Sequence, residues 1–302
     1  MSITVSQVAY AGWPNCYQVS DGAVEVIVTA DVGPRVIRCG FNDGPNLFGE
    51  FPEQAGLTGG EDWRIFGGHR LWHSPESKSR TYAPDNDPVT VATLLDGLRL
   101  TQAMEVSTGI QKELQIRLNH NHSFRVIHLL TNLGCWPVTL APWGITVMRT
   151  GGVAILPQNR ASDAEGLLPN RILALWPYTE MNDPRVTWGS HFILLRQDPE
   201  RRQAFKIGLS VPQNWAGYLN DGFLFLKRFA YDPAVAYPDG GVNVELYTND
   251  RILELETLGP LTTLAPGESV EYAEEWELYR NLKRIRDEND VKQVLGPEFV
   301  GD

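Results

Sequence analysis

The chain has 302 residues, 42% of them hydrophobic, which supplies one large core, although two average domains would also fit this length. Its formal net charge of -11 at pH 7 predicts repulsion from phosphate backbones and anionic membranes, so neither nucleic acids nor membranes are expected partners. Residues 1–10 lack the features of a signal peptide and no apolar run approaches the roughly 18 to 20 residues that cross a bilayer, which predicts a soluble, cytoplasmic protein.

The first half of the chain alternates apolar and polar residues with a period of two, the pattern of strands with one buried face. Strands are expected at residues 23–30, 35–41, 89–95, 97–106, 113–118, 123–132 and 137–148. Residues 42–87 are turn-rich and contain few strands. Loops of that length usually carry function.

The second half begins with another long turn-rich stretch, at residues 156–189, and then alternates again. Strands are expected at residues 205–211, 222–230, 241–249, 251–258 and 269–278. Residues 279–295 have mixed charges and apolar residues at helical spacing, so this tail is expected to be the one helix.

About a dozen short strands without interleaved helices predict an all-β fold, an antiparallel sandwich with a short C-terminal helix. The strands are spread evenly and leave no linker, so residues 1–302 are expected to form a single domain. Its oligomeric state is left open. The cysteines Cys16, Cys39 and Cys135 are widely separated and odd in number, and we expect them to be buried free thiols.

The segment GGHRLWHSPE, residues 67–76, gathers two histidines, an arginine, a tryptophan and a glutamate behind two glycines. Glycines let a backbone approach a ligand closely, and an indole beside hydrogen-bonding groups is suited to hold a sugar ring. The alternative is an ordinary loop in which Trp72 packs against the sandwich and Arg70 pairs with Glu76. The clustering favours a sugar site that includes His69, Arg70, Trp72, His73 and Glu76.

Three later strands place polar residues on shared faces. Asn243, Glu245 and Tyr247 point to one side, where Glu245 is a candidate general base or, alternatively, part of a solvent-facing strip. Lys206 shares its face with two small residues. Lys227 interrupts a phenylalanine face, so it either extends to water at a sheet edge or points into a polar cavity.

Other constellations are weaker. His120 and His122 have metal-compatible spacing but no evident third ligand, so no metal is expected. Glu254 and Glu256 share a face and are expected to lie on a solvated edge. Nucleotide-binding loops and the serine-hydrolase elbow are absent from the sequence.

Several segments together resemble galactose mutarotase-like proteins and cover most of the chain. They are VEVIVTADVGPRVIRCGF, NLFGE, GGHRLWHSPE, LLPNRILALWPYT, YPDGGVNVELYTN and LETLGPLTTLAPGESVEYAEEWEL. The resemblance implies a β-supersandwich, in which two curved antiparallel sheets hold a carbohydrate on a concave side.

The resemblance also implies an activity, that of an aldose 1-epimerase. By position, Glu245 matches the family's catalytic base, His69 or His73 its acid, and Arg35 its early arginine. The family's motif of an asparagine and a glycine followed by leucine-histidine-glycine is missing from this sequence. Trp143 stands where the family's second histidine motif is expected. Substrate-binding residues are expected to be Arg35, Arg70, Trp72, Glu76, Trp143, Lys206, Lys227, Asn243 and Tyr247.

The expected partner is therefore a small-molecule sugar or an oligosaccharide, and the chemistry requires no cofactor. A non-catalytic carbohydrate-binding protein is the first alternative. A polysaccharide lyase or glycoside hydrolase on the same fold is the second, because one fold hosts unrelated chemistries.

Overall fold

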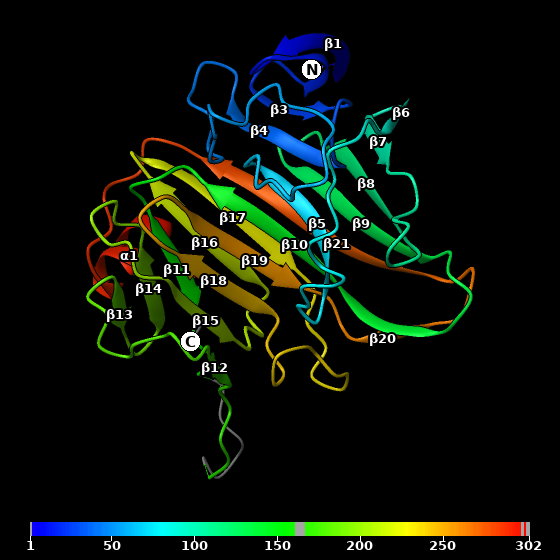
Figure 1. The fold of residues 1–302 in the computed structure, drawn as a ribbon. Coiled ribbons are helices and arrows are strands. Elements are labelled where there is room, and N and C mark those ends of the chain that lie inside the picture. Colours follow the sequence, from blue (N-terminus) through cyan, green and yellow to red (C-terminus); the bar gives the residue numbers. More distant parts are fainter. Residues whose placement is uncertain (1, 161–166, 297–298, 300–302) are drawn as a thin grey trace.

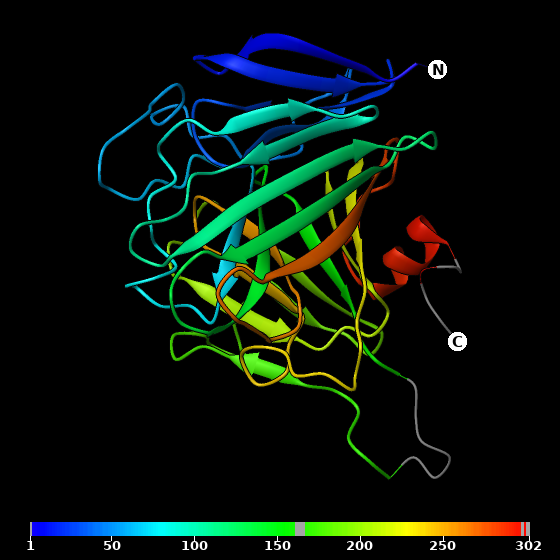
Figure 2. The same ribbon diagram turned by 90° about the vertical axis from the view of Figure 1, so that its right-hand side faces the viewer.

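The computed structural model describes residues 2–160, 167–296 and 299. Within them the chain forms two large sheets in which every strand pair is antiparallel (Figures 1 and 2). The larger sheet has the order β1 (Thr4–Tyr10), β2 (Trp13–Ser20), β3 (Val24–Thr29), β4 (Arg35–Phe41), β5 (His69–Ser74), β10 (Val138–Met148), β19 (Leu253–Leu258), β18 (Val244–Thr248), β15 (Phe205–Leu209) and β12 (Leu173–Leu175), with β20 (Thr262–Leu264) paired to β10 outside this order.

The second sheet packs against the larger one. Its order is β13 (Val186–Trp188), β14 (Phe192–Arg196), β11 (Val153–Pro157), β16 (Trp215–Asn220), β17 (Phe223–Phe229), β21 (Ser269–Tyr279), β9 (Phe124–Asn132), β8 (Ile110–Leu118), β7 (Gly97–Thr101) and β6 (Thr90–Thr93). The largest buried apolar cluster draws side chains from both sheets, for example Leu71 and Leu255 from one and Leu114 and Phe225 from the other. The predicted all-β antiparallel sandwich is confirmed.

The single helix among the described residues is shorter than expected. Strand β21 continues to Tyr279 because its alternation persists to that residue, and α1 begins only at Glu288 and ends at Leu295. Asp287 caps it by accepting hydrogen bonds from the backbone N–H groups of Asn289 and Asp290. Figure 1 places α1 beside β14, and its buried Val291 and Leu295 belong to an apolar cluster with side chains from β11, β14, β16 and β17 of the second sheet. No helix in the described ranges is long and apolar enough to cross a membrane.

Two further expectations need correction. Cys16 and Cys39 are buried free thiols as predicted, but Cys135 is exposed in the turn between β9 and β10. Strand β5 lies within a stretch that we expected to be mainly loop. All six of its residues are buried, so both of its faces are covered and the sequence shows no apolar–polar contrast.

Candidate functional site

A pocket of about 430 Å³ lies on the face of the larger sheet that is turned away from the second sheet. Alternation along the strands places it there: Leu71 and Leu255 point into the sandwich core, so their neighbours Arg70, Trp72, Glu254 and Glu256 point to the other side. The pocket is lined by Trp63, Ile65, Arg70, Trp72, Glu76, Tyr82, Trp143, Ile145, Tyr178, Ala204, Lys206, Tyr247, Ile252, Glu254 and Glu256.

Strand register brings these side chains together from distant parts of the sequence. On β10, Trp143 lies opposite Trp72 of β5. Farther across the sheet, Glu254 of β19 lies opposite Tyr247 of β18, which in turn lies opposite Lys206 of β15. Directly opposed residues of an antiparallel pair share a face, and so do residues two positions apart on a strand, so the five strands present these side chains on one face of the sheet.

Aromatic side chains form one wall of the pocket. Trp72 packs edge to face against Trp63, Tyr82 and Trp143, with ring centroids 5.6, 4.9 and 5.6 Å apart. Trp63 and Tyr82 come from residues 42–87, and Tyr178 comes from residues 156–189. Both long turn-rich stretches therefore contribute to the pocket.

Arg70 lies against this aromatic wall. Its guanidinium is 4.7 Å from the ring centroid of Trp72 and 5.6 Å from that of Trp63. Its Nη2 donates a hydrogen bond of 2.8 Å to Glu254. The ion pair between Arg70 and Glu76, which belonged to the alternative of an ordinary loop, does not form, and Glu76 instead accepts from the hydroxyl of Tyr82 at 2.6 Å.

Lys206 carries the second positive charge of the pocket. Its Nζ lies 2.7 Å from Glu245 and 3.2 Å from Glu256, and Glu256 also accepts from the indole N–H of Trp143 at 2.9 Å. Burial opposes the charge of Lys206, but Glu256 and Glu245 outweigh it and raise its pKa. Burial also raises the pKa of Glu256, and that of Glu245 still further. One ammonium cannot balance two buried carboxylates, so one of the pair retains a proton at neutral pH.

Several buried polar atoms of the pocket residues have no hydrogen-bond partner among the described residues. They are Nε and Nη1 of Arg70, Nε1 of Trp63 and Oε1 of Glu256. A buried donor or acceptor without a partner costs roughly 1–3 kcal/mol. These groups supply three donors and one acceptor at the wall and floor of one pocket.

The structure brings seven of the sequence-predicted residues to this site. Arg70, Trp72, Glu76, Trp143, Lys206 and Tyr247 line the pocket, and Glu245 lies behind Lys206, fully buried. The other predicted residues, Arg35, His69, His73, Lys227 and Asn243, are buried elsewhere, and no histidine of the described residues lines the pocket.

Arg35 and Asn243 have structural contacts instead. Arg35 donates to the carbonyl oxygens of Ile65 and Gly67 at 2.9 Å each and to Asp85 at 2.7 Å, so it holds the loop that carries Trp63 and Ile65 over the sheet. Asn243 exchanges two hydrogen bonds with the backbone of Val211. The glycines before β5 also pack against backbone: a Cβ on Gly67 would lie 2.1 Å from the carbonyl oxygen of Gly49, so this position requires a glycine for chain packing.

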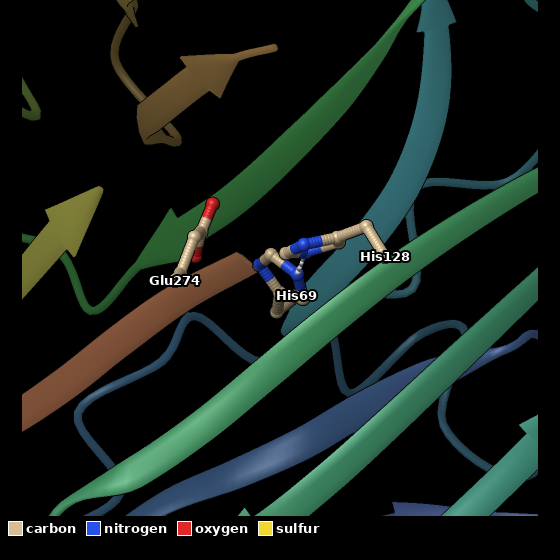
Figure 3. Close-up of side chains that lie close together, drawn as sticks. All are labelled: His69, His128 and Glu274. Atoms are coloured by element: carbon tan, nitrogen blue, oxygen red, sulfur yellow. Dashed lines mark hydrogen bonds between the residues drawn. The ribbon is translucent and has the colours of Figure 1, made fainter. Parts of the chain in front are cut away.

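His69 and His73 lie on the opposite face of β5 from Arg70 and Trp72, toward the second sheet. Figure 3 shows His69 and His128 of β9 with their Nε2 atoms facing each other, 2.7 Å apart, and Glu274 of β21 nearby. His73 lies 3.8 Å from Glu105, a carboxylate that pairs with Lys112. Because the two histidines lie behind the sheet, neither reaches a ligand in the pocket.

The three side chains in Figure 3 are close enough to bind a metal ion, but their hydrogen bonds describe a different arrangement. The carbonyl oxygen of Tyr272 can only accept a hydrogen bond, so Nδ1 of His128 carries a proton. In neutral His128 the other ring nitrogen, Nε2, therefore accepts from Nε2–H of His69. Nδ1 of His69 then accepts from the hydroxyl of Thr146. The network is complete with both histidines neutral. Burial lowers the pKa of each histidine, in agreement with this arrangement.

Lys227 completes the same buried cluster. Its Nζ donates to the carbonyl oxygens of Gly144 and Leu255 at 3.1 and 3.2 Å and lies 3.3 Å from Glu274. The charge of Glu274 is therefore already balanced, and a divalent cation would add uncompensated charge to the core. Of the two alternatives for Lys227, the polar interior is the correct one. In the other histidine pair singled out in the sequence, His120 and His122, the ring of His122 forms a hydrogen bond with Asp21.

Sequence reasoning missed two central residues of the pocket. Glu254 and Glu256 were expected on a solvated edge, but they are only 9% and 1% exposed because β19 lies in the interior of the sheet and loops cover its outer face. The sequence contains one signal, the alternation in LELET, which places both carboxylates on one face. It gives no information about what covers that face.

Comparisons with known proteins identify the fold. No protein-family model and no curated protein sequence matches this chain. A galactose mutarotase-like protein from Lactobacillus casei ATCC 334 superposes with a TM-score of 0.60 at 10% identity, over 88% of this chain and 100% of the other. A galactose mutarotase related enzyme from Lactobacillus acidophilus gives 0.53 at 10% identity, over 90% and 100%.

A third structure, a TPR-domain containing protein from Parabacteroides distasonis, gives a TM-score of 0.57 at 14% identity, over 91% of this chain and 50% of the other. At these identities the similarity concerns the fold alone. The chain has the galactose mutarotase-like fold, as its sequence resemblance implied.

Proposed function

We propose that the pocket binds a carbohydrate in its ring form, either a monosaccharide or the terminal unit of an oligosaccharide. The observation that carries this proposal is the set of unpartnered buried groups on Arg70, Trp63 and Glu256 at one aromatic-walled pocket. A sugar supplies hydroxyls that both donate and accept, and its C–H groups pack on indole faces. The pocket volume falls within the range of ligand sites, roughly 300 to 1,000 Å³.

The second candidate function is interconversion of sugar anomers, favoured by Glu254 and Glu256. Alternation places both on one face of β19, where Glu254 is paired with Arg70 and Glu256 has a raised pKa. A carboxylate beside a protonated carboxyl group is an acid–base pair. Here it replaces the histidine acid expected from the resemblance.

In this reaction Glu254 takes the proton of the anomeric hydroxyl while Glu256 donates its proton to the ring oxygen. The bond between C1 and the ring oxygen breaks and leaves an open-chain aldehyde. Rotation and reclosure on the other face of the carbonyl return both protons and give the other anomer. This step requires no cofactor.

Calorimetry of the wild-type protein with a panel of neutral monosaccharides tests the binding proposal. Glu254→Gln should weaken binding about tenfold or more, because the amide removes a charge-assisted acceptor and unpairs Arg70. Glu277→Gln is the matched control, since Glu277 also pairs with an arginine but lies on the second sheet. If no sugar binds, the proposal is wrong.

Polarimetry of freshly dissolved α-anomers with the same proteins tests catalysis. Glu256→Gln should keep sugar binding but slow interconversion by roughly 10² to 10⁴, because the amide cannot donate a proton to the ring oxygen. A wild-type protein that binds a sugar but interconverts its anomers no faster than buffer would be a binding protein without this activity.

A further inference from the structure

The pocket contains more acidic than basic groups. Glu76, Glu254 and Glu256 line it together with only two cations, Arg70 and Lys206. Both cations already contact carboxylates, Arg70 that of Glu254 and Lys206 those of Glu245 and Glu256. Each cation therefore already has a carboxylate as counter-charge, although Nε and Nη1 of Arg70 can still donate hydrogen bonds to a ligand.

Two carboxyl groups retain capacity for a positive charge, that of Glu256 when the proton held by the pair lies on Glu245. Glu256 is 1% exposed, and its Oε1 has no partner in the described part of the chain. Glu76 is exposed at the mouth and accepts from Tyr82, and no basic side chain of the described residues forms an ion pair with it. One acceptor is thus buried and unsatisfied, and the other is accessible from solvent.

We infer that the pocket selects amino sugars, in which a protonated amino group replaces one hydroxyl, over neutral sugars, and that it rejects sugars carrying phosphate or carboxylate. The inference rests on the proposed function, because it names the class of sugar for the same site. An ammonium group supplies up to three N–H donors and the positive charge that the carboxylates lack. An anionic sugar meets the carboxylates of Glu76 and Glu254, the pair of Glu245 and Glu256 with its one further negative charge, and no unpaired cation.

The test compares sugars that differ in charge but share stereochemistry. Calorimetry in low salt would use the amino, neutral, and 6-phosphate or uronate forms of the gluco, galacto and manno series. In the series that fits the pocket, the amino form should bind roughly fivefold to fiftyfold more tightly than the neutral form, as expected for one added ion pair at a partly buried site. The anionic form should bind least.

Two variants and one control test whether the carboxyl groups of Glu76 and Glu256 cause the preference for the amino form. Glu76→Gln should lower the preference for the amino form, and Glu256→Gln should lower it further, because solvent and salt screen the buried carboxylate less. Glu277→Gln should leave the preference unchanged. Raising the pH above the pKa of the sugar amine should abolish the preference in the wild-type protein.

The outcomes separate the two proposals. If neutral sugars bind as tightly as their amino forms in every series, or an anionic form binds best, the inference about charge is overturned while carbohydrate binding stands. A preference that survives both Glu76→Gln and Glu256→Gln would also overturn it. Absence of binding by every sugar in the panel would overturn the proposed function itself.

Discussion

At the scale of single residues, Glu245 shows how burial changes the role of a side chain. The sequence identifies it as a general base, but its side chain is fully buried and contacts Lys206. Burial raises its pKa well above the usual range, with Glu256 adding to this effect and Lys206 opposing it. A group whose pKa rises on folding stabilises the protein below its unfolded pKa, near 4.3, and this stabilisation is lost as the pH rises through the folded value.

Glu245→Gln should therefore leave the free energy of unfolding nearly unchanged at pH 4 and raise it by about 1 kcal/mol or more at pH 7. The amide keeps the volume of the side chain without a buried charge, and Glu256 still balances Lys206 at 3.2 Å. Urea unfolding at both pH values measures the difference, with Glu277→Gln as the control. A loss of stability at pH 7 would mean that the pair of Glu245 and Lys206 is ionised and stabilising.

At the scale of elements, Lys227 joins the two sheets behind the pocket. It extends from β17 to the carbonyl oxygens of Gly144 on β10 and Leu255 on β19, the two strands that carry Trp143 and Glu254 on their outer face. Gly144 leaves the space for this cluster, since a Cβ there would lie 2.5 Å from Oε1 of Glu274. The buried cluster thus supports the strands that form the floor of the pocket.

Lys227→Met should lower the free energy of unfolding by about 3–5 kcal/mol, because it leaves the carboxylate of Glu274 buried without its counter-charge. Adding Glu274→Gln should recover part of that loss, so that the double variant is more stable than the sum of the two single changes predicts. Chemical denaturation of the four proteins measures this coupling. Strictly additive effects would show that the ammonium and the carboxylate do not depend on each other.

At the scale of the whole molecule, buried histidines determine the response to acid. Burial lowers the pKa values of His69, His73 and His128. Each histidine stabilises the fold fully above its unfolded pKa of about 6.5, and that contribution is lost as the pH falls toward the lower folded value. Glu245 and Glu256 have raised pKa values and act in the opposite direction.

We therefore expect the free energy of unfolding to fall between pH 7 and pH 5. The three neutral histidines outnumber the one proton that Glu245 and Glu256 retain between them, so over most of this range the unfolded chain binds more protons than the folded protein, and stability falls with the pH. Urea titrations at intervals across this range measure the slope. Glu245→Gln should make it steeper, because it removes one opposing group; a flat profile would contradict the assignment of neutral buried histidines.

The sequence by itself determined the all-β antiparallel fold, because apolar–polar alternation with a period of two can be recognised within each short segment, without knowledge of its neighbours in space. It also identified residues that the structure brings to one pocket, among them Arg70, Trp72, Trp143 and Lys206. Alternation and clustering were enough for these residues, because side chains two positions apart on a strand share a face wherever the strand is placed.

Only the tertiary structure decided which face of each strand is functional. Alternation places His69 and Arg70 on opposite faces of β5. Nothing in the neighbouring sequence shows that His69 points into the sandwich and Arg70 into the pocket. The burial of Glu254 and Glu256 likewise depends on loops from distant parts of the chain that cover β19. Those contacts join residues far apart in sequence, so packing, rather than any local pattern, sets the charge and the accessibility of each site residue.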